Sequence, residues 1–127
     1  MEAPELQAGL RILVVDDHRG SAEILALLLK RLGHQVETAT NGEAALGLAE
    51  TFKPEVAFLD LVLPDMDGYE VSRRLRALDF SIRLLALSGY PPDDRSVAFD
   101  EHLMKPVSLD ALRSALQRWG SSPTTEA

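Results

Sequence analysis

The chain has 127 residues, no cysteine and a formal net charge of −7 at pH 7. This length fits one domain with its own core, and the lack of cysteine excludes disulfides and thiolate metal sites. The acidic balance argues against direct nucleic-acid or membrane binding, and no apolar stretch approaches the ~20 residues of a membrane span. The N-terminus lacks the pattern of a signal peptide, so we expect a cytoplasmic protein.

Apolar runs typical of buried strands alternate with helical patterns along the chain. Residues 12–15 form the first run, followed by a helical pattern with Ser21 as its predicted cap and Gly33 as its stop signal. The predicted apolar face of this helix consists of Ile24, Leu27, Leu28 and Leu32. Residues 34–39 alternate partly and predict a second strand. We expect both His18 and His34 at the surface, because neither has a ligand-type neighbour.

Thr40 and Glu43 have the spacing of a capping box at the start of a second helix. Pro54 ends that segment before a third apolar run at residues 56–59, and turn residues at 63–68 predict a loop. The apolar face predicted for the next helix consists of Val71, Leu75 and Leu78.

Residues 84–87 and 102–104 predict the last two strands, and Ser108 the cap of the last helix. The predicted apolar face of this helix is Leu109, Leu112, Leu116 and Trp119. Ser88 and Lys105 are only 17 positions apart (105 − 88), which leaves little chain between these strands. We therefore expect the helix between them to be short or absent.

Charged side chains follow three of the predicted strands. Asp16 and Asp17 follow the first strand, Asp60 the third, and Lys105 with Pro106 the fifth. The carboxyl ends of parallel strands meet at one edge of a doubly wound sheet, so these side chains should converge. Clustered carboxylates repel one another unless a cation joins them, which predicts a divalent cation beside the lysine.

Four short motifs in this order resemble the signature of response-regulator receiver domains. They are Val14-Val15-Asp16-Asp17, Asp60 with Pro64 and Gly68, Leu87-Ser88-Gly89, and Lys105-Pro106. The resemblance implies an α/β, flavodoxin-like, doubly wound fold with five parallel strands in the order 2-1-3-4-5. It also implies a phosphoacceptor of a two-component phosphorelay, whose partner is a histidine kinase or a histidine phosphotransfer protein.

The resemblance implies a role for each residue at the strand ends. Asp60 is the phosphoacceptor, while Lys105 and Ser88 contact the phosphoryl oxygens. The implied cofactor is Mg²⁺, held by Asp16, Asp17, Asp60 and the backbone carbonyl of Val62. Within this set, Asp17 is the direct ligand and Asp16 acts mainly through metal-bound water.

Further residues are implied to tune the site or to switch with it. Gly89 leaves room for the phosphoryl group, Tyr90 limits the access of water, and Pro106 forms a cis peptide bond that aims the lysine inward. His102 stands where receivers commonly carry an aromatic switch residue. With so short a segment before it, we expect no dimerisation through this face. Any switch should stay in the loops around Ser88 and Lys105 or act through another surface, such as the first helix.

Other functions stay open at this stage. An aspartyl-phosphate hydrolase like the haloacid dehalogenases needs a second acid two positions after its nucleophile, where this chain has Val62. A degenerate receiver that only binds partners, or a nucleotide-binding flavodoxin-like domain, is the other alternative. Asp65 and Asp67 are expected to be solvated loop or capping residues. We predict one receiver domain at residues 10–119, with flexible ends at 1–9 and 120–127.

Overall fold

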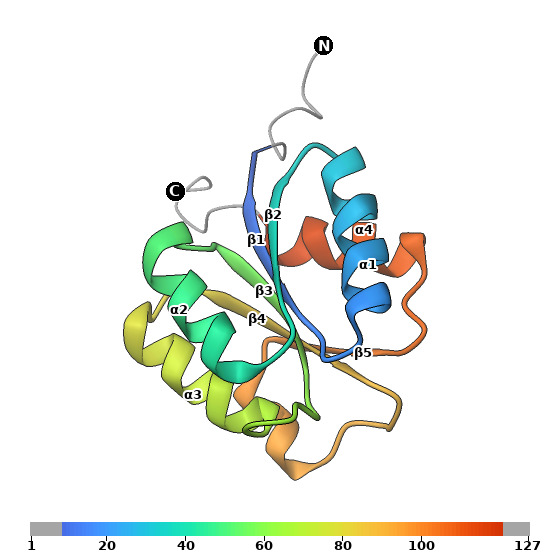
Figure 1. Ribbon diagram of the computed structural model, residues 1–127. Coiled ribbons are helices and arrows are strands. Elements are labelled where there is room, and N and C mark those ends of the chain that lie inside the picture. Colours follow the sequence, from blue (N-terminus) through green and yellow to red (C-terminus); the bar gives the residue numbers. More distant parts are fainter. Residues whose placement is uncertain (1–8, 121–127) are drawn as a thin grey trace, which may run out of the picture.

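The computed structural model describes residues 9–120 and contains a five-stranded parallel sheet in the order β2-β1-β3-β4-β5 (Figure 1). The predicted flexible ends fall almost entirely outside this range. The strands are β1 (Arg11–Val15), β2 (Gln35–Ala39), β3 (Val56–Asp60), β4 (Arg83–Ser88) and β5 (Glu101–Met104). The predicted fold class and strand order are confirmed.

The central strands are apolar because helices cover both of their faces. Every residue of β3 is buried, as expected for a parallel strand in the middle of such a sheet. Val15 pairs with Leu59 and Leu59 with Ala86, so β1, β3 and β4 end at the same level. The residues that follow these strands therefore lie along one edge of the sheet.

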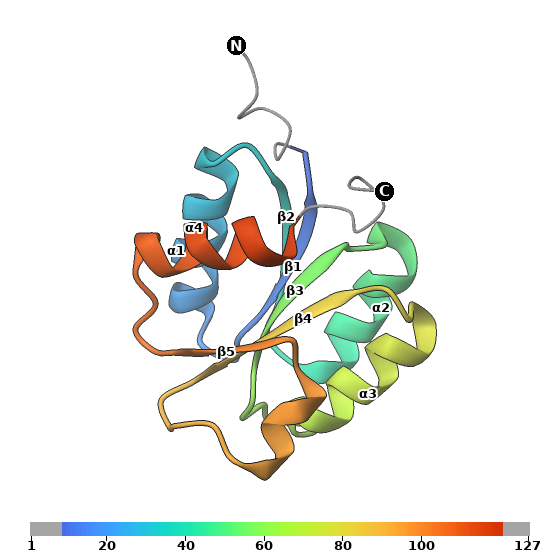
Figure 2. The ribbon, with the colours of Figure 1, turned by 180° about the vertical axis from the view of Figure 1, so that it is seen from behind.

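Two helices cover each face of the sheet (Figures 1 and 2). On one face lie α1 (Arg19–Arg31) and α4 (Leu109–Trp119), and on the other α2 (Gly42–Phe52) and α3 (Gly68–Leu78). Within residues 9–120, no helix has the length and apolarity that a membrane crossing requires.

The predicted start of α1 was wrong and its predicted apolar face was half right, because Leu28 and Leu32 of that face pack against the core. The helix begins at Arg19 with His18 at the N-cap position, which places Ser21 inside the first turn. The residues buried against the sheet are Ala22, Ala26 and Leu29. Ile24 and Leu27, which were predicted to pack inward, are 63% and 50% exposed. Two small alanines share the buried face with Leu29, so large apolar side chains alone do not mark that face.

Other local predictions had mixed outcomes. Asn41, rather than Thr40, caps α2 by accepting a hydrogen bond from the Ala44 amide, whereas the predicted Ser108 cap of α4 is confirmed. His18 is exposed as expected, but His34 is buried, with only 7% of its surface accessible. His34 follows Gly33 at the end of α1, where the turn folds its ring inward. Leu78 and Leu109, at helix ends, are largely exposed.

Between β4 and β5 the chain forms η2 (Asp94–Ala98), a 3₁₀ helix of five residues. The Asp93 side chain caps this helix, and the Ser96 hydroxyl oxygen accepts a hydrogen bond from the Asp93 amide. The guanidinium of Arg95 lies 4.2 Å from the ring centre of Tyr69, which attaches η2 to α3. That this segment is shorter than is usual in receiver domains, the family that the sequence resembles, stays a prediction.

Candidate functional site

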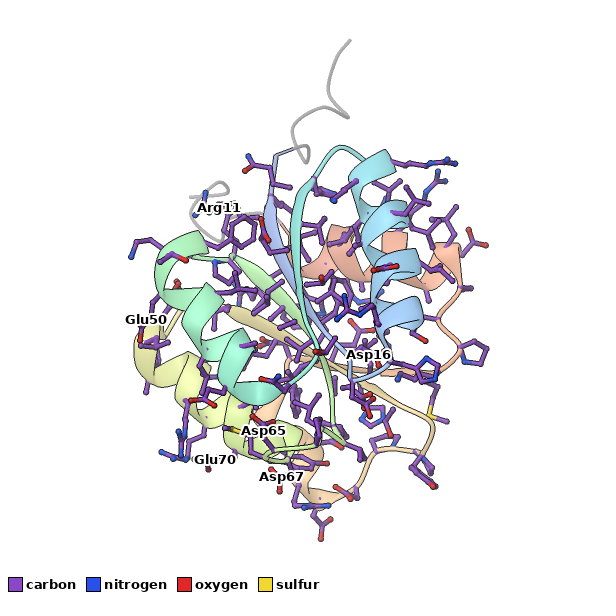
Figure 3. The ribbon with its side chains drawn as sticks, in the orientation of Figure 1. Arg11, Asp16, Glu50, Asp65, Asp67 and Glu70 are labelled. Atoms are coloured by element: carbon purple, nitrogen blue, oxygen red, sulfur yellow. The ribbon has the colours of Figure 1, made fainter. Side chains whose placement is uncertain are left out.

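The carboxyl ends of the strands bring the predicted charged residues together. Asp16 directly follows β1, Asp60 is the last residue of β3, and Lys105 directly follows β5. Carboxylate oxygens of Asp16, Asp17 and Asp60 lie within 4.8 Å of one another. Figure 3 shows Asp16 at this edge of the sheet. Convergence of these groups, predicted from the sequence, is thus observed.

Backbone amides orient the two buried carboxylates. Asp16 is 2% exposed, and its Oδ1 accepts a hydrogen bond from the His18 amide at 3.0 Å. Asp60 is 7% exposed, and its Oδ1 accepts one from the Val62 amide at 3.1 Å. Each bond comes from the turn immediately after the strand, so the turn fixes the direction in which its own carboxylate points.

The ammonium of Lys105 bridges the two carboxylates. Its Nζ lies 3.2 Å from Asp16 Oδ2 and 3.1 Å from Asp60 Oδ2. The Lys105 amide donates to the Ser88 carbonyl at 2.8 Å, which continues the pairing of β4 and β5 beyond the last strand residue. The Lys105-Pro106 peptide bond is cis, in agreement with what the resemblance implied.

Burial and charge act in opposite directions at this site. Burial raises the pKa of Asp60, and the Asp16 charge adds to that rise, while the Val62 amide and Lys105 partly offset it. Burial disfavours the charged form of Lys105, but its bonds and charge interactions with Asp60 and Asp16 outweigh that effect and raise the pKa of the ammonium. The lysine therefore stays charged and helps to keep Asp60 ionised.

The donor set suits a hard divalent cation. Three carboxylates offer only oxygen ligands, and Asp17, the exposed member, leaves the cluster open to solvent. Mg²⁺ prefers such sites because it binds one or two carboxylates and retains several of its waters. These residues can hold a metal ion, and the positive charge of an ion would relieve the repulsion among them.

Ser88 begins a chain of contacts that leads away from the site. Its Oγ accepts a hydrogen bond from the Tyr90 amide at 3.0 Å. The Tyr90 carbonyl in turn accepts one from His102 Nε2 at 2.9 Å, and His102 Nδ1 lies 3.5 Å from Ser96 Oγ. The predicted tuning residues Tyr90 and His102 are thus connected to Ser88. A Cβ added at Gly89 would meet nothing within 4 Å, so the space beside it is open.

Two hollows flank the carboxylates. One, of about 460 Å³, lies between α1 and the segment that follows β5, and is lined by Asp16, Lys105, Ile24 and Leu28, among others. The other, of about 420 Å³, is lined by Val62, Ser88, Tyr90 and Arg95, among others. Both sides of the candidate site are therefore accessible from solvent.

Sequence reasoning did not identify the partners of Asp65. It was expected to be solvated or to cap a helix, and it does cap one, but this is α2, more than 20 positions earlier in the chain. Asp67, by contrast, caps the helix that follows it by accepting from the Glu70 amide. The Asp67 cap can be predicted from the local sequence pattern. The contact between Asp65 and α2 can be seen only in the folded structure.

Comparisons with known proteins match most of this chain to one family. The family described as "Response regulator receiver domain" matches residues 12–117. The sporulation initiation phosphotransferase F of Bacillus subtilis is 31% identical over 114 residues, which is 86% of this chain and 92% of that protein. The virulence sensor protein BvgS of Bordetella bronchiseptica is 35% identical over 122 residues, 87% of this chain but only 10% of that protein.

Solved structures show the same fold. The response regulator TrrA of Thermotoga maritima, solved in complex with Mg²⁺ and BeF, is 31% identical with a TM-score of 0.80, covering 87% of this chain and 98% of that one. The chemotaxis protein CheY4 of Vibrio cholerae is 26% identical with a TM-score of 0.83, covering 88% and 99%.

Proposed function

Because the chain belongs to the response regulator receiver family, the phosphoacceptors of two-component signalling, we propose that Asp60 is the residue that accepts the phosphoryl group. One observation carries this assignment. The Asp60 carboxylate is buried, accepts hydrogen bonds from the Val62 amide and the Lys105 ammonium, and lies within 4.8 Å of the carboxylates of Asp16 and Asp17. A carboxylate held in this way is a nucleophile with charge stabilisation beside it.

The transfer itself needs little covalent chemistry from the protein. An Asp60 carboxylate oxygen attacks phosphorus, and the bond from phosphorus to the donor's imidazole nitrogen breaks as the new P–O bond forms. The imidazole leaves neutral when its other nitrogen carries a proton. Lys105 stays charged throughout and attracts the phosphoryl oxygens. The Ser88 Oγ accepts from the Tyr90 amide, so its hydroxyl proton is free to donate to one of these oxygens.

We propose Mg²⁺ as the cofactor, held by Asp16, Asp17, Asp60 and the Val62 carbonyl. When bound, it would neutralise charge on the carboxylates and on the phosphoryl oxygens. The three carboxylates fit this role because their oxygens, which are hard ligands, lie within 4.8 Å of one another. Asp16, held by the His18 amide, supplies charge at a fixed position.

The partner we propose is a histidine kinase or a histidine phosphotransfer protein. Ile24 and Leu27 on α1 are largely exposed, and Ile24 lines the hollow that reaches Asp16 and Lys105. A helix that presents a phosphohistidine could bury these side chains while its imidazole enters the site. We propose no hydrolase activity toward other substrates, because position 62 offers a valine where a leaving group would need an acid.

Phosphorylation by a small donor tests the assignment. We expect acetyl phosphate to add one phosphoryl group, and beryllofluoride to bind, only when Mg²⁺ is present. Asp60→Asn should abolish the adduct, because an amide cannot form an acyl phosphate. Asp94→Asn is the matched control, since Asp94 lies on η2 away from the cluster and its variant should be modified like the wild type.

Intact-protein mass spectrometry reads the outcome directly. A full adduct on Asp60→Asn, or a metal-independent adduct on the wild type, would refute the assignment. Loss of the adduct in both aspartate variants would show a general effect on folding, which circular dichroism of each variant checks.

A further inference from the structure

The loop between β3 and α3 is held to α2 by one carboxylate. Asp65 Oδ1 accepts a hydrogen bond from the Gly42 amide at 2.7 Å, and Oδ2 accepts one from the Glu43 amide at 2.9 Å. Figure 3 shows Asp65 beside the first turn of α2, with Asp67 farther along the same loop. A single side chain thus joins two segments that lie 22 and 23 positions apart.

Asp65 completes the capping of α2. The first amides of a helix have no partner within the helix, and Asn41 serves only the Ala44 amide. Asp65 serves the two amides before it, at the positive end of the helix dipole, where a carboxylate is favoured. These amide bonds, Gly42 first and Glu43 second, lower the pKa of Asp65, so its carboxylate stays charged.

The base of the same loop is closed by a second anchor. The Gly68 amide donates to the Leu61 carbonyl at 2.9 Å. A Cβ at Gly68 would lie 2.7 Å from both the Asp60 carbonyl oxygen and Leu61 Cα, so α3 begins directly against the phosphoacceptor's own backbone. Val62 lies between this base and the tip that Asp65 holds.

The tip of the loop packs tightly on α2. A Cβ at Gly42 would lie 2.5 Å from Met66 Cγ and 2.9 Å from Val71 Cγ2, so there is no room for a side chain at this contact. Glycine here permits the close approach that the Asp65 bonds require. The loop is therefore fixed at both ends, and its position depends on α2 as well as on β3.

We propose that Asp65 is a positioning residue of the phosphoacceptor site, which clamps the loop to α2 and thereby keeps the Val62 carbonyl in place as a ligand for Mg²⁺. This deepens the proposed function and rests on it. Mg²⁺ tolerates little deviation from octahedral geometry, so a carbonyl on a loosened loop binds it less well. Residues that orient metal ligands typically contribute tenfold or more to metal affinity.

Three variants separate the clamp from simple helix stability. Asp65→Ala removes the clamp. Asn41→Ala removes the other cap of the same end of α2 without touching the loop, and Asp67→Ala removes a cap from the same loop without touching α2. Mg²⁺ affinity is measured by calorimetry, and amide hydrogen exchange at Gly42 and Glu43 reports the clamp itself.

Asp65→Ala should weaken Mg²⁺ binding roughly tenfold and expose both amides to exchange. The two controls should lower the midpoint of thermal unfolding by roughly 4 °C while Mg²⁺ affinity stays at the wild-type value. Asp65→Asn, which keeps one acceptor oxygen, should fall between wild type and Asp65→Ala, and it decides the question if the alanine variant does not fold.

Two results would overturn the proposal. One is wild-type Mg²⁺ affinity in both Asp65 variants, and the other is an equal loss of affinity in Asn41→Ala. Failure of the proposed function looks different, because the wild type itself would then bind no Mg²⁺ and would accept no phosphoryl group.

Discussion

Replacing Lys105 by methionine should destabilise the metal-free protein and strengthen its binding of Mg²⁺ at the same time. Methionine keeps much of the length of the side chain but removes the ammonium that bridges Asp16 and Asp60. Without it, the two carboxylates repel each other across a buried site. A metal ion then meets more negative charge and no competing cation, so its affinity should rise several-fold.

The size of the destabilisation follows from the geometry. At 3.1 Å and 3.2 Å, each contact corresponds to about 5 kcal/mol of Coulomb energy at an effective dielectric constant of about 20. Desolvation cancels much of this, and the Lys105 side chain is 33% exposed, whereas those of Asp60 and Asp16 are only 9% and 3% exposed. We expect a net loss of about 2 to 3 kcal/mol in the free energy of unfolding, below the range for fully buried pairs.

The loss should depend on pH and on the metal. Lys105 lowers the pKa of Asp60, so its removal raises further a pKa that burial already raises. A carboxylate whose pKa is raised by folding favours the folded state at low pH, and this contribution is lost as pH rises through the folded pKa. The variant should therefore be least stable near neutral pH without Mg²⁺, and should recover in acid or with the metal.

Urea unfolding at several pH values, with and without Mg²⁺, measures these effects, and Lys30→Met on the exposed surface of α1 is the matched control. The reasoning would be refuted if Lys105→Met lost the same free energy under all conditions. Weaker Mg²⁺ binding in this variant would refute it as well.

Three further predictions concern other parts of the chain. Burial lowers the pKa of His34, whose Nδ1 has no hydrogen-bond partner within residues 9–120. Stability should therefore fall as pH drops below about 6.5, by at most about 1.4 kcal/mol per pH unit, and His34→Leu should flatten this slope in urea titrations. Val62 and Tyr90 are 68% and 74% exposed, and neither offers a carboxylate or an amide to position a water, so the acyl phosphate should be long-lived. Val62→Asn should shorten its lifetime roughly tenfold, whereas unchanged decay in this variant and in Tyr90→Ala would contradict the idea. With only η2 between β4 and β5, we predict that beryllofluoride leaves the protein monomeric in sedimentation, and a dimer protected over residues 93–119 would contradict this.

The strands of the sheet could be predicted from the sequence because each buried strand is a short apolar segment, and a charged residue follows several of them. Residues 56–59 are uniformly apolar, and Asp60 follows at once, so both the central strand and its functional end could be located. The resemblance then supplied the strand order, which periodicity alone does not contain. The convergence of Asp16, Asp60 and Lys105 followed from the first inference alone, because the carboxyl ends of parallel strands meet at one edge of the sheet.

Predictions failed where a residue's hydrogen-bond partners are distant in the chain, and where the size of an apolar side chain did not indicate whether it is buried. Ile24 has the same apolar character as Leu29, and only the approach of alanines Ala22 and Ala26 to the sheet decides which side is buried. His34 carries a polar ring that usually stays in water, but the turn after α1 buries it. Asp65 has its partners on another helix, so no local pattern could name them.

Asp60 and Asp65 lie close in the chain and carry identical side chains, but their surroundings give them different properties. Asp60 is buried, so its pKa is raised, and Lys105 helps to keep it ionised. Asp65 is exposed, and two helix amides lower its pKa, so it remains an anion without help. A nucleophile benefits from the first setting, because its charge responds to the ligands that arrive. An anchor benefits from the second, because the clamp on α2 then persists whatever the state of the acceptor.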